Sequence, residues 1–213
     1  MEDVNYMLVW VAVQGVSQDD ALATLKMELS DSVESRDVSG WPDFLNRRDL
    51  HDRIFLGQIP GNWLLLFGNI DEEGKDRLAQ LVRLGPAFAG DISRIGNFAE
   101  ARSYADGREV WSVTYDLESH RAEDLLTVEG PLPGALEAIL ADARAAEADG
   151  WGSDIGVDVL FEVPGTLSKA ICGFSPHEAP PKGFRWSMLQ RIGGEPEPKP
   201  KPRGFFARLF GRG

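Results

Sequence analysis

The run Tyr6–Val13, with the sequence YMLVWVAV, is the strongest constraint on how this chain can fold. Its residues are apolar without interruption, and most are β-branched or aromatic. A strand with one face in water alternates polar and apolar residues, so an unbroken run predicts a strand that is buried on both faces. The run is too short to span a membrane as a helix, which takes about 20 apolar residues.

Local signals along the first ninety residues predict the order β-α-β-β-α-β. Ser17 offers an N-cap oxygen to a helix, and Pro60-Gly61 has the chemistry of a turn between two strands. This order is that of the ferredoxin-like, split βαβ arrangement. The expected elements are a strand over 6–13, a helix after Ser17 through Leu22, Leu25 and Leu29, strands over 53–59 and 62–67, a helix that Asp71 caps and that runs through Leu78, Leu81 and Val82, and a strand over 87–92.

The second half opens on the clearest local signal in the chain. Asp106-Gly107 is a dipeptide that favours a two-residue type I′ turn, so 97–105 and 108–116 are expected to form a β-hairpin. Prolines 131 and 133 then introduce a helix that ends near Asp149. Alternating apolar residues predict a strand over 155–163, and a short helix is expected over 164–172.

These elements predict an α+β fold with a mixed or antiparallel sheet and helices on one face. The first half is expected to be ferredoxin-like, and the second half to be a β-hairpin followed by helix. We expect a single domain over 1–192. Alternating prolines then make 193–203 an extended linker, and 204–213 is a basic, amphipathic C-terminal peptide.

Charge is the first clue to function. The chain has 22 basic and 34 acidic residues, a net charge of −12, and its last fifteen residues hold five basic and no acidic residues, which leaves −17 on the residues before them. Such an acidic body repels a phosphate backbone, so nucleic-acid binding through the main domain is not expected. It would attract a basic protein partner, although acidity also serves solubility alone.

Signatures of catalysis and of cofactor or metal binding are missing from the sequence. Its three histidines are scattered, Gly173–His177 departs from a nucleophile elbow in its fifth residue, and Cys172 stands alone as the one cysteine. We therefore expect no cofactor and no metal site, and we assign no catalytic residue. Together with the acidic start Met1-Glu2-Asp3, which does not look like a secretory signal, these features favour a cytoplasmic protein.

The hairpin is the first candidate binding surface. A two-residue turn with undisturbed pairing places Phe98 and Arg102 on the same sheet face as Trp111 and Tyr115, with Arg102 across from Trp111 in a cation–π pair. Aromatic and arginine side chains are enriched at interface hot spots. The alternative is a half-covered sheet whose aromatic residues pack against neighbouring elements.

Two further segments are candidates for binding. The long polar stretch 30–52 contains Trp41, Arg47, Arg48 and His51, which could hold a carboxylate or phosphate, or could simply form a solvated loop. The C-terminal peptide would gather its apolar residues on one face of a helix, as a docking peptide or a weak membrane-surface contact does. It could also fold back on its own acidic body or have no role. Its candidate residues are Phe205, Phe206, Arg208, Leu209 and Phe210.

These observations favour a non-enzymatic protein-binding module with a basic protein as its partner. In its acidity, its α+β pattern and its lack of a catalytic signature, the chain is similar to small bacterial toxin-immunity and adaptor proteins, a likeness of class only. One alternative is a small hydrolase that uses scattered carboxylates and His51 or His177. Another is a module that its C-terminal peptide tethers to a membrane surface or to a partner.

Overall fold

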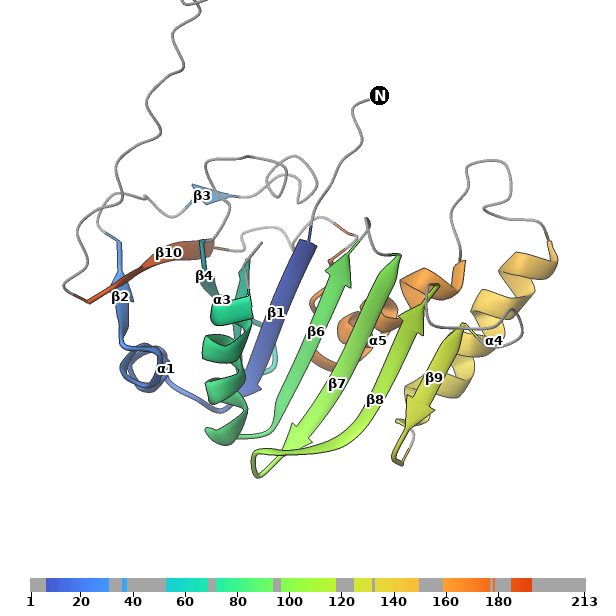
Figure 1. Ribbon diagram of the computed structural model, residues 1–213, viewed down its shortest axis with the longest axis horizontal. Helices are drawn as coiled ribbons and strands as arrows, with labels where there is room; N and C mark the ends of the chain where they lie inside the picture. Colours follow the sequence, from blue (N-terminus) through green and yellow to red (C-terminus); the bar gives the residue numbers. More distant parts are fainter. Residues whose placement is uncertain are drawn as a thin grey trace, which may run out of the picture.

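One antiparallel sheet carries the fold in the computed structural model, which describes residues 7–30, 36–37, 53–68, 72–93, 97–117, 125–131, 133–149, 159–176, 178 and 185–192. The ten described strands follow the order β2-β10-β4-β5-β1-β6-β7-β8-β9, with β3 also paired to β10 (Figure 1). The elements are β1 (Met7–Gln14), α1 (Gln18–Leu25), β2 (Met27–Leu29), β3 (Arg36–Asp37), β4 (Phe55–Ile59), β5 (Trp63–Gly68), α3 (Glu72–Leu78), the 3₁₀ helix η2 (Ala79–Arg83), β6 (Ala87–Ser93), β7 (Phe98–Ala105), β8 (Arg108–Asp116), β9 (Leu126–Glu129), α4 (Gly134–Ala148), the 3₁₀ helix η3 (Val159–Glu162), α5 (Val163–Cys172) and β10 (Arg185–Arg191).

The α+β class and the ferredoxin-like order of the first half are confirmed. In sequence the described elements run β1-α1-β4-β5-α3-β6, with the short strands β2 and β3 between α1 and β4 and the 3₁₀ helix η2 before β6. In the sheet the four strands lie in the order β4-β5-β1-β6. Strand β5 therefore separates β1 from β4, which is the split of the βαβ unit. Ser17 caps α1 as expected, since its Oγ accepts a hydrogen bond of 3.1 Å from the backbone N–H of Asp20.

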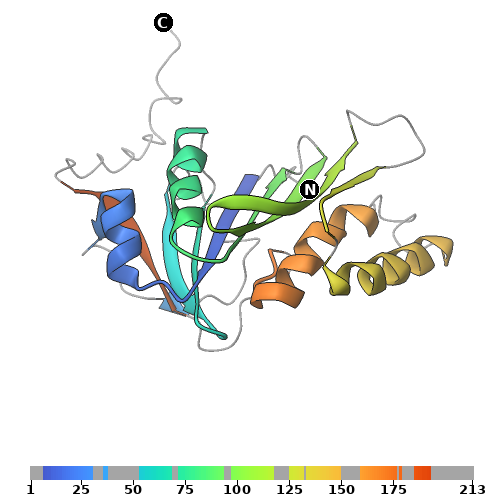
Figure 2. The same cartoon turned by 90° about the horizontal axis from the view of Figure 1, so that it is seen from below.

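The helices cover both faces of the sheet, where the sequence predicted one. Helices α1 and α3 lie on one face, over the half that contains β1, β4 and β5, and α4 and α5 lie on the other face beneath β6–β9 (Figure 2). The unbroken apolar run in β1 is the physical reason. Val9, Val11 and Val13 pack with the first pair of helices, and Leu8, Trp10 and Ala12 face the second. None of the described helices has the length and apolar character to cross a bilayer.

Trp10 fixes how α5 sits on the sheet. Its side chain is fully buried, and its indole N–H donates a hydrogen bond of 3.1 Å to Ser168 Oγ in α5. On the neighbouring strand Gly90 pairs with Trp10, and a Cβ at Gly90 would lie 2.1 Å from the ring. The ring therefore occupies the space that any other residue at position 90 would fill.

Two sequence predictions of secondary structure are wrong. The helix after Ser17 ends at Leu25, because Lys26 adopts a left-handed conformation with φ of 54°, and Leu29 then lies in the edge strand β2. In the predicted strand 155–163, residues from Val159 onward form η3 and the start of α5 instead. Pro164 explains this, because proline is favoured in the first turn of a helix and cannot donate to a sheet.

Strand β10 was not predicted. It adds residues 185–191 to the sheet beside β4. Its weak signal is the alternation of Trp186 and Met188, which face the α5 side of the sheet. Strand β10 lies near the edge of the sheet opposite β9, so the chain beyond Ile192 starts on that side of the sheet.

We predict that Gly90→Ala destabilises the fold by about 1–3 kcal/mol, the usual cost of forcing extra volume into a packed core. Trp10→Phe should cost stability alone but should lessen the effect of Gly90→Ala, since a smaller ring frees the space. Urea unfolding of the wild type, both single variants and the double variant gives the coupling energy. Additive effects would contradict direct contact between Trp10 and position 90.

Candidate functional site

A β-bulge changes the predicted face of the hairpin. The turn itself is as expected, with positive φ at both Asp106 and Gly107. Ala105 pairs with Arg108 and Tyr104 with Glu109, but Ser103 pairs with Trp111, so Val110 is an extra residue in β8. From there on the register predicted from the turn is wrong by one residue, which exchanges the two faces of β8.

The bulge separates the four residues that were predicted to form one surface. Trp111 and Tyr115 lie on the buried face with Ala99 and Ala101, where they are 7% and 1% exposed. Burying two large rings against small residues outweighs the disturbed ladder, because each ring removes about 150–250 Å² from water. The predicted cation–π pair between Arg102 and Trp111 is therefore wrong.

Arg102 instead lies on the opposite face of the sheet, held by two carboxylates. Its guanidinium donates hydrogen bonds of 2.6 Å to Glu100 and 3.3 Å to Glu109. The hydrogen bond to Glu100 raises the pKa of Arg102 above its ordinary value, while burial raises the pKa of the neighbouring Tyr104 hydroxyl. Phe98 is half-buried on this face. These contacts make Arg102 part of a network within its own hairpin.

The other predicted binding residues lie outside the residues that the structure describes. These are Trp41, Arg47, Arg48 and His51 in the polar stretch, and Phe205, Phe206, Arg208, Leu209 and Phe210 in the C-terminal peptide. The same holds for His177, the second histidine of the hydrolase hypothesis.

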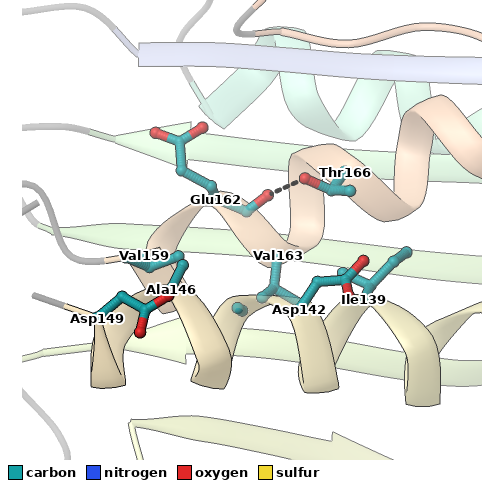
Figure 3. Close-up of a pocket in the computed structure, with 9 residues that line it drawn as sticks. Ile139, Asp142, Ala146, Asp149, Val159, Glu162, Val163 and Thr166 are labelled. Carbon is teal, nitrogen blue, oxygen red and sulfur yellow. Dashed lines mark hydrogen bonds between the residues drawn. The ribbon is translucent and has the colours of Figure 1, made fainter. Parts of the chain in front are cut away.

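A groove between α4 and the η3–α5 segment is the strongest candidate site in the described structure (Figure 3). Its volume is about 430 Å³, within the range of about 300–1,000 Å³ that is typical of binding sites. The apolar lining residues are Ile139, Ala143, Ala146, Val159 and Val163, and the polar ones are Asp142, Asp149, Glu162 and Thr166. We call this feature the α4–α5 groove.

Core contacts hold both walls of the α4–α5 groove in place. Phe161 of η3 packs edge-on against Tyr115 with ring centroids 5.6 Å apart, and α5 is fixed by the hydrogen bond from Trp10 to Ser168. Helix α4 packs on the core through Leu136, which is fully buried. Tyr115 thus packs against η3, which forms part of one groove wall. This is a different role from the recognition role that the sequence suggested.

Among the described residues, the ionisable side chains that line the α4–α5 groove are all acidic. Asp142 and Asp149 lie on the α4 wall, seven residues and so about 10 Å apart along the helix. Figure 3 shows their carboxylates beside the apolar side chains of the groove, while the Glu162 carboxylate points away from that wall. Thr166 donates its hydroxyl to the backbone carbonyl of Glu162 at 3.0 Å. The groove is thus an apolar trough with two carboxylates along one side.

The carboxylate of Asp149 is not explained by the stability of α4. Asp149 lies at the C-terminal cap of the helix, whose last turn has no basic residue. Negative charge at a helix C-terminus is unfavourable by about 0.3–1 kcal/mol, because it meets the negative end of the helix dipole. An acidic residue at the C-terminal end of a helix was therefore a sequence signal for the site. Carboxylates are too common in this chain, however, for a single one to be recognised.

The described residues offer little catalytic chemistry. No group of three or more His, Cys, Asp or Glu side chains in the described ranges could hold a metal ion. Cys172 is buried, and burial raises the pKa of its thiol, which disfavours the nucleophilic thiolate. Its Sγ donates to the carbonyl of Ser168, one turn earlier in the helix.

We predict that Trp111→Ala costs about 3–5 kcal/mol of unfolding free energy, as expected for a buried ring. Val110→Ala should change stability by less than about 0.5 kcal/mol, because Val110 is exposed at the bulge. Urea unfolding of the two neighbouring variants tests the register. The predicted pairing without a bulge would instead make Trp111 part of an accessible face and its loss mild.

No family model, curated protein or solved structure matches this chain.

Proposed function

We propose that this protein is a protein-binding module whose α4–α5 groove takes a cationic, amphipathic segment of a partner protein. The observation that carries the proposal is an apolar groove in which each ionisable lining residue is acidic. A helical segment with apolar residues on one face can fill such a groove, in the helix-in-groove mode of recognition. Lysine or arginine side chains beside that face can then pair with Asp142 and Asp149.

The charge of the whole chain supports the same kind of partner. The residues before the C-terminal fifteen carry −17, and an acidic surface speeds the approach of a basic protein. Acidic residues at the groove can then pair with the basic residues of a partner that the acidic surface has attracted from a distance. Long-range and local charge thus favour the same class of partner.

Binding is favoured over catalysis by the polar groups at the groove. Thr166 is the hydroxyl residue of its lining, and its hydroxyl donates to the backbone, whereas a nucleophile needs a neighbouring base. The hydrolase alternative depends on His51 or His177 and the tethering alternative on the C-terminal peptide, so both stay predictions. Neutralisation of a basic toxin, as an immunity protein, is the specific form of the proposal, with adaptor function as the broader form and the cytoplasm as the location.

Charge reversal at the groove tests this function. We expect the double variant Asp142→Lys/Asp149→Lys to lose, by at least about tenfold in affinity, the protein that the wild type captures from a lysate of its native host. The double variant Asp76→Lys/Glu147→Lys makes the same change in net charge at exposed sites outside the groove lining, and it should keep the partner. Equal capture by the two variants would contradict a role for the groove.

The fold of the groove variant is checked by urea unfolding. Lysine at position 149 should leave the free energy of unfolding unchanged or raise it by about 0.3–1 kcal/mol, because it complements the helix dipole. A loss of capture together with full stability assigns the effect to the surface.

We also predict that the association rate with a captured partner falls about tenfold or more when the salt concentration rises from about 50 to about 300 mM, since salt screens attraction at long range. Stopped-flow mixing with the purified partner measures this rate. The dissociation rate should change much less, because the apolar contacts in the groove are not screened. An association rate that does not depend on salt would contradict steering by the acidic body.

A further inference from the structure

We propose that the α4–α5 groove binds the C-terminal peptide 204–213 of a second copy of this chain. The inference rests on the proposed function, because it concerns the same groove. It assigns a specific ligand to that groove. The peptide lies outside the described residues, so the argument uses its sequence, the groove and the position at which the described chain ends.

The C-terminal peptide has the chemistry that the groove calls for. Phe205, Phe206, Leu209 and Phe210 follow at i, i+1, i+4 and i+5, the spacing that brings side chains to one face of a helix. Arg208 and the neighbouring cations supply positive charge, and no acidic residue occurs from Lys199 onward. The peptide is therefore an amphipathic, cationic segment attached to an otherwise strongly acidic chain.

The groove is complementary to the peptide in both properties. Its apolar side chains can receive phenylalanine and leucine, which gain about 1.5–3 kcal/mol each when they are fully buried. Asp142 and Asp149 stand along one wall, so cations along one side of the apolar face of the peptide can meet a carboxylate. Among its described lining residues there is no basic side chain that would repel the arginines.

The length of the linker favours a groove on another molecule. The described chain ends just after β10, and Figure 1 shows α4 near the opposite end of the sheet, beside β9. Seven strand-to-strand steps separate β10 from β9, which is about 34 Å across the sheet. The linker 193–203 spans about 34 Å when it is extended as a proline-rich segment. Crossing the sheet thus uses its whole length and leaves none for the turn towards the helices, and a second copy offers a groove without that strain.

Docking in this way joins two different surfaces, the groove of one copy and the peptide of the next. Such a heterologous contact leaves one free groove and one free peptide at the ends of each assembly. Self-association should therefore rise with protein concentration and weaken with salt. A basic partner would have to displace the peptide to enter the groove.

Complementation between two variants tests the proposal. The groove variant Asp142→Lys/Asp149→Lys keeps its peptide, and the peptide variant Phe206→Glu/Phe210→Glu keeps its groove. Sedimentation velocity of the full-length chains should show that the wild type self-associates, that each variant alone is weakened at least about tenfold, and that a 1:1 mixture forms a heterodimer. The control Asp76→Lys/Glu147→Lys should behave as the wild type does.

A second groove variant separates the effect of blocking the groove from the effect of changing its charge. Ala146→Trp fills the groove without altering its charge, so it should also prevent self-association, and it should form a heterodimer with the peptide variant. Far-ultraviolet circular dichroism and a urea unfolding midpoint that match the wild type show that each variant is folded. A monomeric wild type at all accessible concentrations, or association that the mixture does not restore, would overturn the proposal.

The proposed function can fail separately from this inference. If the mixture stays monomeric while Asp142→Lys/Asp149→Lys still loses the captured partner, the groove binds a partner but not the peptide. If the mixture forms a heterodimer and capture does not depend on the groove, the peptide is its ligand and the partner binds elsewhere. Failure in both experiments would show that the groove is not a docking site.

Discussion

The burial of β1 on both of its faces is the constraint on which the rest of the fold depends. A strand with valines on one face and Leu8, Trp10 and Ala12 on the other cannot leave either face in water, so each face needs its own layer of helices. Trp10 makes the second layer specific, because it needs both the space left by Gly90 and the hydroxyl of Ser168. A sheet with helices on a single face is thus incompatible with this strand.

The position of the groove follows from how the two layers share the sheet. Helices α1 and α3 cover the half around β1, β4 and β5, while α4 and α5 extend beneath β6–β9. Core contacts from Trp10 and Tyr115 hold α5 and η3 against the sheet, whereas α4 lies at the end of this layer. The groove lies on the side of α4 that faces η3 and α5, with Asp149 at the C-terminal end of α4 along it.

Local chemistry predicted most of the elements of the fold, and it could not predict how distant elements adjust to one another. The cap at Ser17 and the turn at Asp106-Gly107 depend on a few adjacent residues, and both formed as expected. The bulge at Val110 depends on packing beneath the sheet, where Trp111 and Tyr115 are buried, so the turn alone gave the wrong face. The groove depends on how α4 and the η3–α5 segment approach each other, and no periodicity within either segment predicts it.

Taken together, the two proposals make the peptide of a second copy and the partner competitors for one groove. Each occupied groove must release its peptide before a partner binds, so the apparent affinity for the partner falls in proportion to the fraction of grooves that are occupied. At low protein concentration most grooves are free and a partner binds at its full affinity. At high concentration self-association protects the apolar groove from non-specific contacts, which an exposed apolar surface otherwise invites. Asp149 at the end of α4, unfavourable for the helix alone, would pair with cations of either proposed ligand, which gives its place there a physical reason.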